Sequence, residues 1–115
     1  MPGFQMNIEP RPNWTIARLH GEASITEITP LEAKLRQITE QRQPNVILDL
    51  SDLSFIDSSA LGILVQFRHD VQGYGGKIRL VGAQNHITDV FRKTRLVELF
   101  PMFDSADEAI DETPS

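Results

Sequence analysis

The residues of this chain best suited to chemistry are two adjacent hydroxyls that follow a carboxylate. Asp57, Ser58 and Ser59 stand directly before the apolar run "ALGILVQF", residues 60–67. Side-chain oxygens of Asp and Ser accept the free N–H groups of a first helical turn, so either Asp57 or Ser58 is suited to cap a helix that begins here. Capping alone does not require all three polar residues, and a modifiable serine is the second interpretation.

A phosphate on Ser58 would lie in a favourable field. The N–H groups at a helix N-terminus favour negative charge by about 0.3–1 kcal/mol at an exposed site. A phosphoserine adds about −1.5 to −2 charge at neutral pH. If a partner buried this charge, a loss of roughly 3–4 kcal/mol would weaken binding about a hundredfold to a thousandfold. Modification would therefore change binding without unfolding the domain.

A nucleophilic enzyme is the third interpretation, and the sequence argues against it. The chain has no G-x-S-x-G turn around Ser58 or Ser59, and His20, His69 and His86 occupy no recognisable triad context. Nothing supplies an ordered base together with an oxyanion site. We therefore expect a protein that is not an enzyme.

The elements that position the serines follow from the spacing of apolar residues. Alternation at Phe4, Met6 and Ile8, followed by "WTIARLH" at 14–20, predicts an antiparallel β-hairpin. The nearly continuous apolar segment "NVILDL", 45–50, predicts a central strand covered on both faces. Residues 51–57 are expected to form a turn and residues 58–72 a helix that is largely buried at its start. A further strand is expected at 77–82.

Helices are predicted between these strands and after the last of them. After Gly21, two capping-box spacings compete for the first helix start, Ser24 with Glu27 and Thr29 with Glu32. This helix should end near Arg42. Later segments predict a short helix at 85–96, a last short strand "VELF" at 97–100, and an acidic helix or frayed tail at 105–112. The order is a hairpin followed by alternating helices and strands, which predicts an α/β fold with a mixed, mostly parallel sheet.

Composition limits the class of protein. The 115 residues, 40% hydrophobic and 23% charged, fit one domain over 1–115 with a core from about 4 to 112, and residues 113–115 are expected to be disordered. A net charge of −5 argues against nucleic acid as the main partner. The absence of cysteine excludes disulfides and thiolate metal sites. Without a signal peptide or a run of about 18 apolar residues, we expect a cytoplasmic protein that is not inserted in a membrane.

The segment "VILDLSDLSFIDSSALGILVQF" resembles the signature of STAS domains of the anti-sigma factor antagonist type. That signature is an apolar strand, a short loop with a buried Phe, here Phe55, and then Asp-Ser-Ser/Thr-Gly/Ala-Leu-Gly. The segments "GGKIRLVG" and "ITDVFRKTRLVELFPMFDSADEAI" follow the same layout. The resemblance covers residues 4 to 112 and implies βα units that coil in one direction, with the parallel strands in sequence order.

The resemblance also implies a mechanism. In this family a partner serine kinase, which is itself an anti-sigma factor, phosphorylates the serine after the aspartate, and a PP2C-type phosphatase removes the phosphate. The unmodified antagonist binds the anti-sigma factor and so releases a sigma factor for transcription. ATP belongs to the kinase, and no cofactor is expected in this chain.

Carried over by motif, Ser58 is the phosphoacceptor. Asp57 would shape the loop and be read by the kinase, and Ser59 would cap the helix or contact the partner. The partner surface implied by the resemblance comprises the loop at 54–59 with Phe55, the first helical turn with Ala60 and Leu61, and the loop from Glu22 to Ser24.

One departure from the family pattern is Ser24. After the second strand the family usually has Gly-Glu/Asp-Leu-Asp, whereas this chain has "GEAS", so Ser24 supplies no negative charge. The departure leaves an alternative function open. That alternative is a STAS module that is not switched and acts as a stress-complex scaffold or as a soluble regulatory subunit of a membrane transporter.

Overall fold

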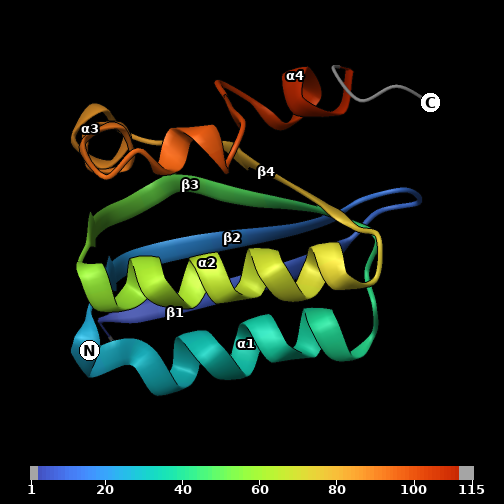
Figure 1. Ribbon diagram of the computed structural model, residues 1–115, viewed down its shortest axis with the longest axis horizontal. Coiled ribbons are helices and arrows are strands. Elements are labelled where there is room, and N and C mark those ends of the chain that lie inside the picture. The colour runs from blue at the N-terminus through green and yellow to red at the C-terminus, as the bar shows by residue number, and fades with distance from the viewer. Residues whose placement is uncertain (1–2, 112–115) are drawn as a thin grey trace.

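The computed structural model describes residues 3–111, and Figure 1 shows their arrangement around one sheet. The strands and the helices, with the 3-10 helices named η, follow one another along the chain as β1 (Phe4–Pro10), β2 (Thr15–Ala23), η1 (Ile25–Glu27), α1 (Ile28–Glu40), β3 (Asn45–Ile56), α2 (Ser58–Gly73), β4 (Lys77–Val81), α3 (Asn85–Lys93), η2 (Leu96–Glu98), β5 (Met102–Phe103) and α4 (Ala106–Asp111). The disorder predicted for 113–115 concerns a segment outside the described residues.

The five strands lie in the order β1-β2-β3-β4-β5, so each strand is beside its neighbour in sequence. β1 and β2 are antiparallel, and every other pair is parallel. The predicted hairpin, the parallel strands in sequence order and the central place of β3 are thereby confirmed. Because parallel strands share one direction, β2 and β3 both end at the same edge of the sheet, beside the start of α2.

Alternating residues of β3 divide the interior into two apolar clusters. Val46 and Leu48 belong to the main core, which also contains the buried residues of α1, α2 and α3. Ile47 points to the opposite face and packs with Trp14, Ala109 and the rest of a smaller cluster under α4. Figure 1 shows α1 and α2 running side by side along the sheet. β3 is therefore covered on both faces, as its apolar sequence predicts.

The helical segment begins after Ser24, one of the two predicted starts, but as the 3-10 helix η1 and without a side-chain cap. α1 begins at Ile28 after η1, its N-cap position is Glu27, and no side chain caps it there. The Ser24 hydroxyl bonds the Thr26 hydroxyl at 2.9 Å instead. The N–H of Ile25 donates to the carboxylate of Asp57 at 2.8 Å, so a residue distant in sequence satisfies a donor of this first turn. The end at Glu40 agrees with the prediction to within two residues.

The turn predicted at 51–57 is wrong, because β3 continues to Ile56. β2 also extends further than expected and pairs with this second half of β3 after two register irregularities, with Glu22 opposite Phe55 and Ala23 opposite Ile56. The polar residues of the segment indicated a turn, but three of them, Ser51, Asp52 and Ser54, lie on solvent-exposed positions of a strand.

The predicted strand at 97–100 is also wrong. Residues 96–98 form η2, and the last strand is Met102–Phe103, which pairs with Leu80 and Val81. Phe100 is fully buried against Phe91 with a ring centroid distance of 5.8 Å. This anchor turns the chain before Pro101, and pairing with β4 begins only afterwards. The helix predicted at 85–96 ends at Lys93, because Arg95 takes a left-handed conformation with φ of 64°.

Candidate functional site

The predicted site residues meet at one edge of the sheet. We call this surface the Ser58 corner: residues 22–25, residues 54–59, and the exposed side of the first turn of α2. The N–H of Asp57 donates to the carbonyl of Ala23 at 3.1 Å, which joins the residues after β3 to the end of β2. The two predicted loops therefore form one surface.

Asp57 joins the two segments of this corner by hydrogen bonds. As N-cap of α2, its carboxylate accepts the N–H of Ala60 at 3.0 Å, and its other oxygen accepts the N–H of Ile25 at 2.8 Å. The N–H of Ala60, with further help from those of Ile25 and Ser59, lowers the pKa of Asp57 against the opposing effect of partial desolvation. Of the two predicted capping residues, Asp57 is the one that caps.

Ser58 is the first residue of α2 and is exposed. Within residues 3–111 the Ser58 hydroxyl makes no hydrogen bond, because the carboxylate of Asp57 accepts the Ala60 N–H and so caps the first turn of α2. Ser59 is half-buried beside it. The Ser58 hydroxyl is thus free of any part in holding the fold and open to another molecule.

The side chains that follow point inward. Ala60 and Leu61 are 0% and 6% exposed and belong to the main core, so their predicted contact with a partner stays a prediction, and in this structure their side chains face the interior. Their burial has a physical cause: Ala60, Leu61, Leu64, Phe67 and Val71 recur at helical spacing on the face of α2 that covers the sheet. These residues fix the position of the helix start from below.

Two large apolar side chains point outward at the corner. Phe55 is 46% exposed, so the buried Phe that the signature implies is not found here. Ile25, which the sequence did not identify as a site residue, is 67% exposed next to the Asp57 carboxylate. Ile25 could have been noticed as a lone branched apolar residue between polar neighbours before a helix. Glu22 is exposed beside them, whereas Ser24 is half-buried and paired with Thr26.

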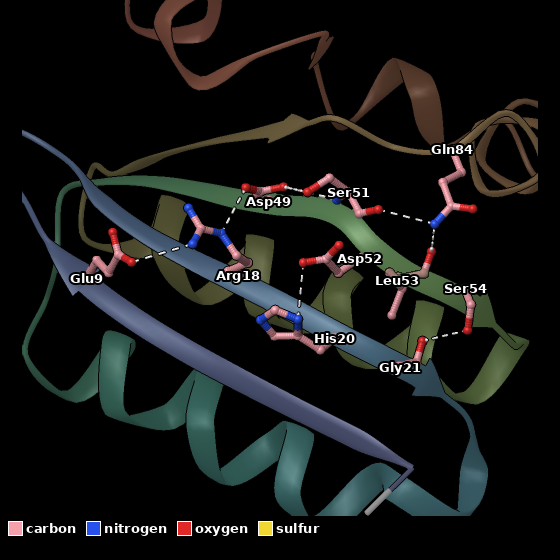
Figure 2. Close-up of polar contacts among 10 residues, drawn as sticks. All are labelled: Glu9, Arg18, His20, Gly21, Asp49, Ser51, Asp52, Leu53, Ser54 and Gln84. Atoms are coloured by element: carbon pink, nitrogen blue, oxygen red, sulfur yellow. Dashed lines mark hydrogen bonds and ion pairs between the residues drawn. The ribbon is translucent and has the colours of Figure 1, made fainter.

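Polar residues continue from the corner along the open face of the sheet, as Figure 2 shows. His20 Nδ1 lies 3.2 Å from Asp52 Oδ2, and Arg18 Nε lies 3.2 Å from Asp49 Oδ2. Burial raises the pKa of Asp49, but hydrogen bonds from Ser51 and the Arg18 guanidinium outweigh it and hold that pKa below its usual value. In each pair the two side chains contact each other, and neither pair contacts Ser58.

Neither a histidine partner for the two serines nor a metal-binding group is found among the described residues. Within residues 3–111, no histidine hydrogen-bonds Ser58 or Ser59: His20 pairs with Asp52 and His86 with the carbonyl of Ser54. In the same range no group of three or more His, Asp or Glu side chains is arranged to hold a metal ion. None of the helices described there has the length and apolar character to cross a membrane. The arrangement offers a surface and a free hydroxyl.

Residues 5–109 match the family model of the STAS domain. The chain belongs to the STAS family. Among the relatives of this STAS protein is the anti-sigma F factor antagonist of Paenibacillus polymyxa, 23% identical over 110 residues, which are 95% of this chain and 94% of the relative.

Solved structures of the same fold include an anti-sigma factor antagonist from Mycobacterium paratuberculosis, with a TM-score of 0.85 and 21% identity over 94% of this chain and 92% of that one. The Bacillus cell fate determinant SpoIIAA in its phosphorylated form matches with a TM-score of 0.72 and 24% identity, over 93% and 97% of the two chains. The resemblance seen in the motif is thereby confirmed for family and fold.

Proposed function

We propose that this STAS protein is an anti-sigma factor antagonist whose binding to an anti-sigma factor is switched by phosphorylation of Ser58. The observation that carries the proposal is the exposed Ser58 hydroxyl, which is without a partner in the described chain because Asp57 caps the helix in its place. The names of the relatives support the kind of partner. The protein acts by binding and carries out no reaction of its own.

The unmodified corner is the form that docks. Phe55 and Ile25 offer apolar anchors of the kind that dominate protein interfaces, and Glu22 adds a charged rim. The anti-sigma factor covers this surface and thereby releases its sigma factor for transcription. Since Ala60 and Leu61 hold the helix start from within the core, the docking surface is firm before the partner arrives.

Phosphorylation places charge at the centre of this surface. The Ser58 oxygen attacks the γ-phosphorus of ATP held by the partner kinase; the new O–P bond forms as the bond to the β-phosphate oxygen breaks, and ADP leaves. The kinase must supply the base that takes the hydroxyl proton, because Asp57 is occupied by backbone N–H groups and its lowered pKa makes it a weak base. A PP2C-type phosphatase then removes the phosphoryl group by hydrolysis, which breaks the O–P bond with water and gives the free Ser58 hydroxyl and inorganic phosphate.

The phosphate weakens docking for two reasons. It adds about −1.5 to −2 charge at neutral pH beside the carboxylates of Glu22 and Asp57. It must also lose its hydration when the partner covers Phe55 and Ile25. A loss of roughly 3–4 kcal/mol corresponds to about a hundredfold to thousandfold weaker binding.

Labelling tests the switch. The purified chain is incubated with [γ-³²P]ATP and each purified serine kinase of the anti-sigma class from the source genome. We expect one phosphate per chain with one of these kinases, lost in Ser58→Ala and retained in the matched control Ser59→Ala. No labelling by any of the kinases, or labelling that survives Ser58→Ala, would contradict the proposal.

Binding tests the consequence with the kinase that labels the chain. Ser58→Asp should melt close to the wild type, since the Ser58 hydroxyl holds nothing in the described fold, and should bind that kinase more weakly in calorimetry. Equal affinity of the two proteins would show that charge at this corner does not control docking. A large fall in the melting temperature would show that the serine is structural.

Ser24 favours a second candidate function, a STAS module that is not switched. Its hydroxyl is paired with Thr26 and brings no negative charge to the corner. Affinity capture from the native cell separates the two functions. Recovery of a transporter or of a large STAS assembly, with no soluble kinase, supports the scaffold or transporter-subunit role.

A further inference from the structure

The second half of β3 has a free edge. β4 pairs with β3 only from Asn45 to Asp49, whereas β3 itself continues to Ile56. On its other edge β3 stays paired with β2 up to Ile56. Residues 50–56, which lead directly into the Ser58 corner, are therefore held by a strand on one side only, and the main-chain groups on the other side need different partners.

Two side chains from the start of α3 supply partners to this edge. Gln84 donates both hydrogens of its amide, one to the carbonyl of Ser51 and one to that of Leu53, each at 3.1 Å. Figure 2 shows this side chain reaching across to β3. Nε2 of His86 lies 2.6 Å from the carbonyl of Ser54 and donates to it. Two side chains thus provide partners for three main-chain carbonyls in this part of β3.

Gln84 makes these bonds although it stands at the N-cap position of α3. Its side chain makes no cap hydrogen bond to its own helix and reaches β3 instead. Gly82 brings the chain close enough, because an added Cβ would lie 3.1 Å from the Cβ of Ser51.

Ser54 receives support from both sides. Its carbonyl accepts from His86, and its own hydroxyl donates to the carbonyl of Gly21 at 3.1 Å on β2. Only Phe55 and Ile56 separate it from Asp57. Ile87 and Phe91 anchor α3 in the main core. The contacts of Gln84 and His86 therefore connect the end of β3, which leads to Ser58, to this anchored helix.

We propose that Gln84 and His86 are positioning residues of the Ser58 corner: they replace the missing strand on the free edge of β3 and thereby hold Phe55 and Asp57 in the place at which a partner kinase meets Ser58. This inference rests on the proposed function for its second half. The first half, the positioning itself, is measurable on the chain alone.

Amide hydrogen exchange tests the positioning without any partner. The informative N–H is that of Asp57, which donates to Ala23 across the corner. In Gln84→Met, which keeps the length of the side chain but removes its donors, exchange at Asp57 should accelerate about five- to tenfold, as expected for the loss of one or two hydrogen bonds. The matched control Gln66→Met loses an amide bond to Asp70 on the surface of α2 and should leave Asp57 unchanged. Unchanged exchange in Gln84→Met would overturn the proposal.

His86 permits a rescue. His86→Leu should accelerate the same exchange, and His86→Gln, whose amide can donate from a similar distance, should restore slow exchange. A merely structural loss of volume would not distinguish the two variants in this way. Slow exchange in His86→Leu would show that the hydrogen bond of His86 has no part in holding the corner.

Labelling with the kinase that phosphorylates the wild type tests the second part of the proposal, that Gln84 and His86 hold the corner in the place at which a kinase meets Ser58. Gln84→Met should raise KM for the chain about five- to tenfold while kcat stays near the wild-type value, because a displaced corner docks poorly but reacts normally once docked. If exchange accelerates but KM is unchanged, Gln84 protects only the sheet edge and the positioning role in docking is wrong. If no kinase labels the wild type, the proposed function fails, and the exchange measurements still decide whether Gln84 and His86 position the corner.

Discussion

At the scale of single residues, the neighbours Asp57 and Ser58 have separate roles in the Ser58 corner. The carboxylate of Asp57 accepts hydrogen bonds from Ile25 and Ala60 and so joins η1 to α2. Within the described residues, the Ser58 hydroxyl makes no hydrogen bond. A residue that both capped the helix and carried a phosphate would lose its cap on modification. The separation of these tasks allows charge to change at the surface while the helix below stays in place.

The carboxylate of Asp57 should make stability depend on acidity. Because its pKa is lowered in the fold, mainly by the N–H of Ala60, its contribution is fully present above the unfolded value of about 3.9 and is lost as the pH falls through the folded value. Asp57→Asn should therefore lower the melting temperature at neutral pH, with a difference from the wild type that shrinks in acid. Thermal melts over a pH series measure this.

A control is available in Asp104, an exposed residue whose carboxylate makes no contact within residues 3–111. Asp104→Asn should give a curve parallel to the wild type over the whole series. If the difference for Asp57→Asn were instead the same at every pH, the Asp57 cap would not depend on its charge.

What could be predicted at this scale follows from chemistry that is local in sequence. Asp57 and Ser58 were identified because capping and modification depend on residue type and on the place before an apolar run. Ile25, Gln84 and His86 were missed because their contacts join segments about 30 residues apart, which spacing along the chain does not reveal. Phe55 was expected inside the fold and lies outside, because β3 extends beyond the predicted end and a register irregularity between Leu53 and Phe55 breaks the alternation there, so that Ser54 and Phe55 are both exposed.

At the scale of elements, the corner exists because β2 and β3 run on together beyond the end of β4. Gly21 lies in the extended part of β2 with φ of 91°, a conformation that favours glycine, and an added Cβ would collide with the carbonyl oxygen of Gly3. Apolar periodicity identified every strand core except β5, but the polar extension of β3 lacks that signal. Its length is decided by pairing with β2, a contact between distant segments.

Two glycine substitutions should have opposite effects. Gly21→Ala should cost about 1–3 kcal/mol of unfolding free energy, because its backbone is strained for any other residue and its neighbour must move. Gly62→Ala, within α2 where an added Cβ meets nothing within 4 Å, should add about 0.5–1 kcal/mol. Urea unfolding of both variants measures the difference. A stabilising effect of Gly21→Ala would show that the extension of β2 is not held in this conformation.

At the scale of the whole molecule, the two faces of the sheet are covered unequally. The main core lies under α1, α2 and α3, whereas within residues 3–111 the opposite face has α4 alone over its small cluster, and the rest of that face carries the Arg18–Asp49 ion pair and the His20–Asp52 contact. The Ser58 corner belongs to the side with the large core. A change in α4 should therefore leave the corner in place.

The single tryptophan reports on this independence. Trp14 is buried in the cluster under α4, together with Ala109, which is fully buried. Ala109→Glu should drive α4 off the sheet, since an unpaired carboxylate is too costly to bury, and the emission of Trp14 should shift to longer wavelength. The matched substitution Ala33→Glu, on an exposed position of α1, should leave that emission unchanged. In the same samples, amide exchange at Asp57 should stay slow in both variants. Fast exchange at Asp57 in Ala109→Glu would mean that the small cluster also holds the corner, and that the two faces of this sheet act as one unit.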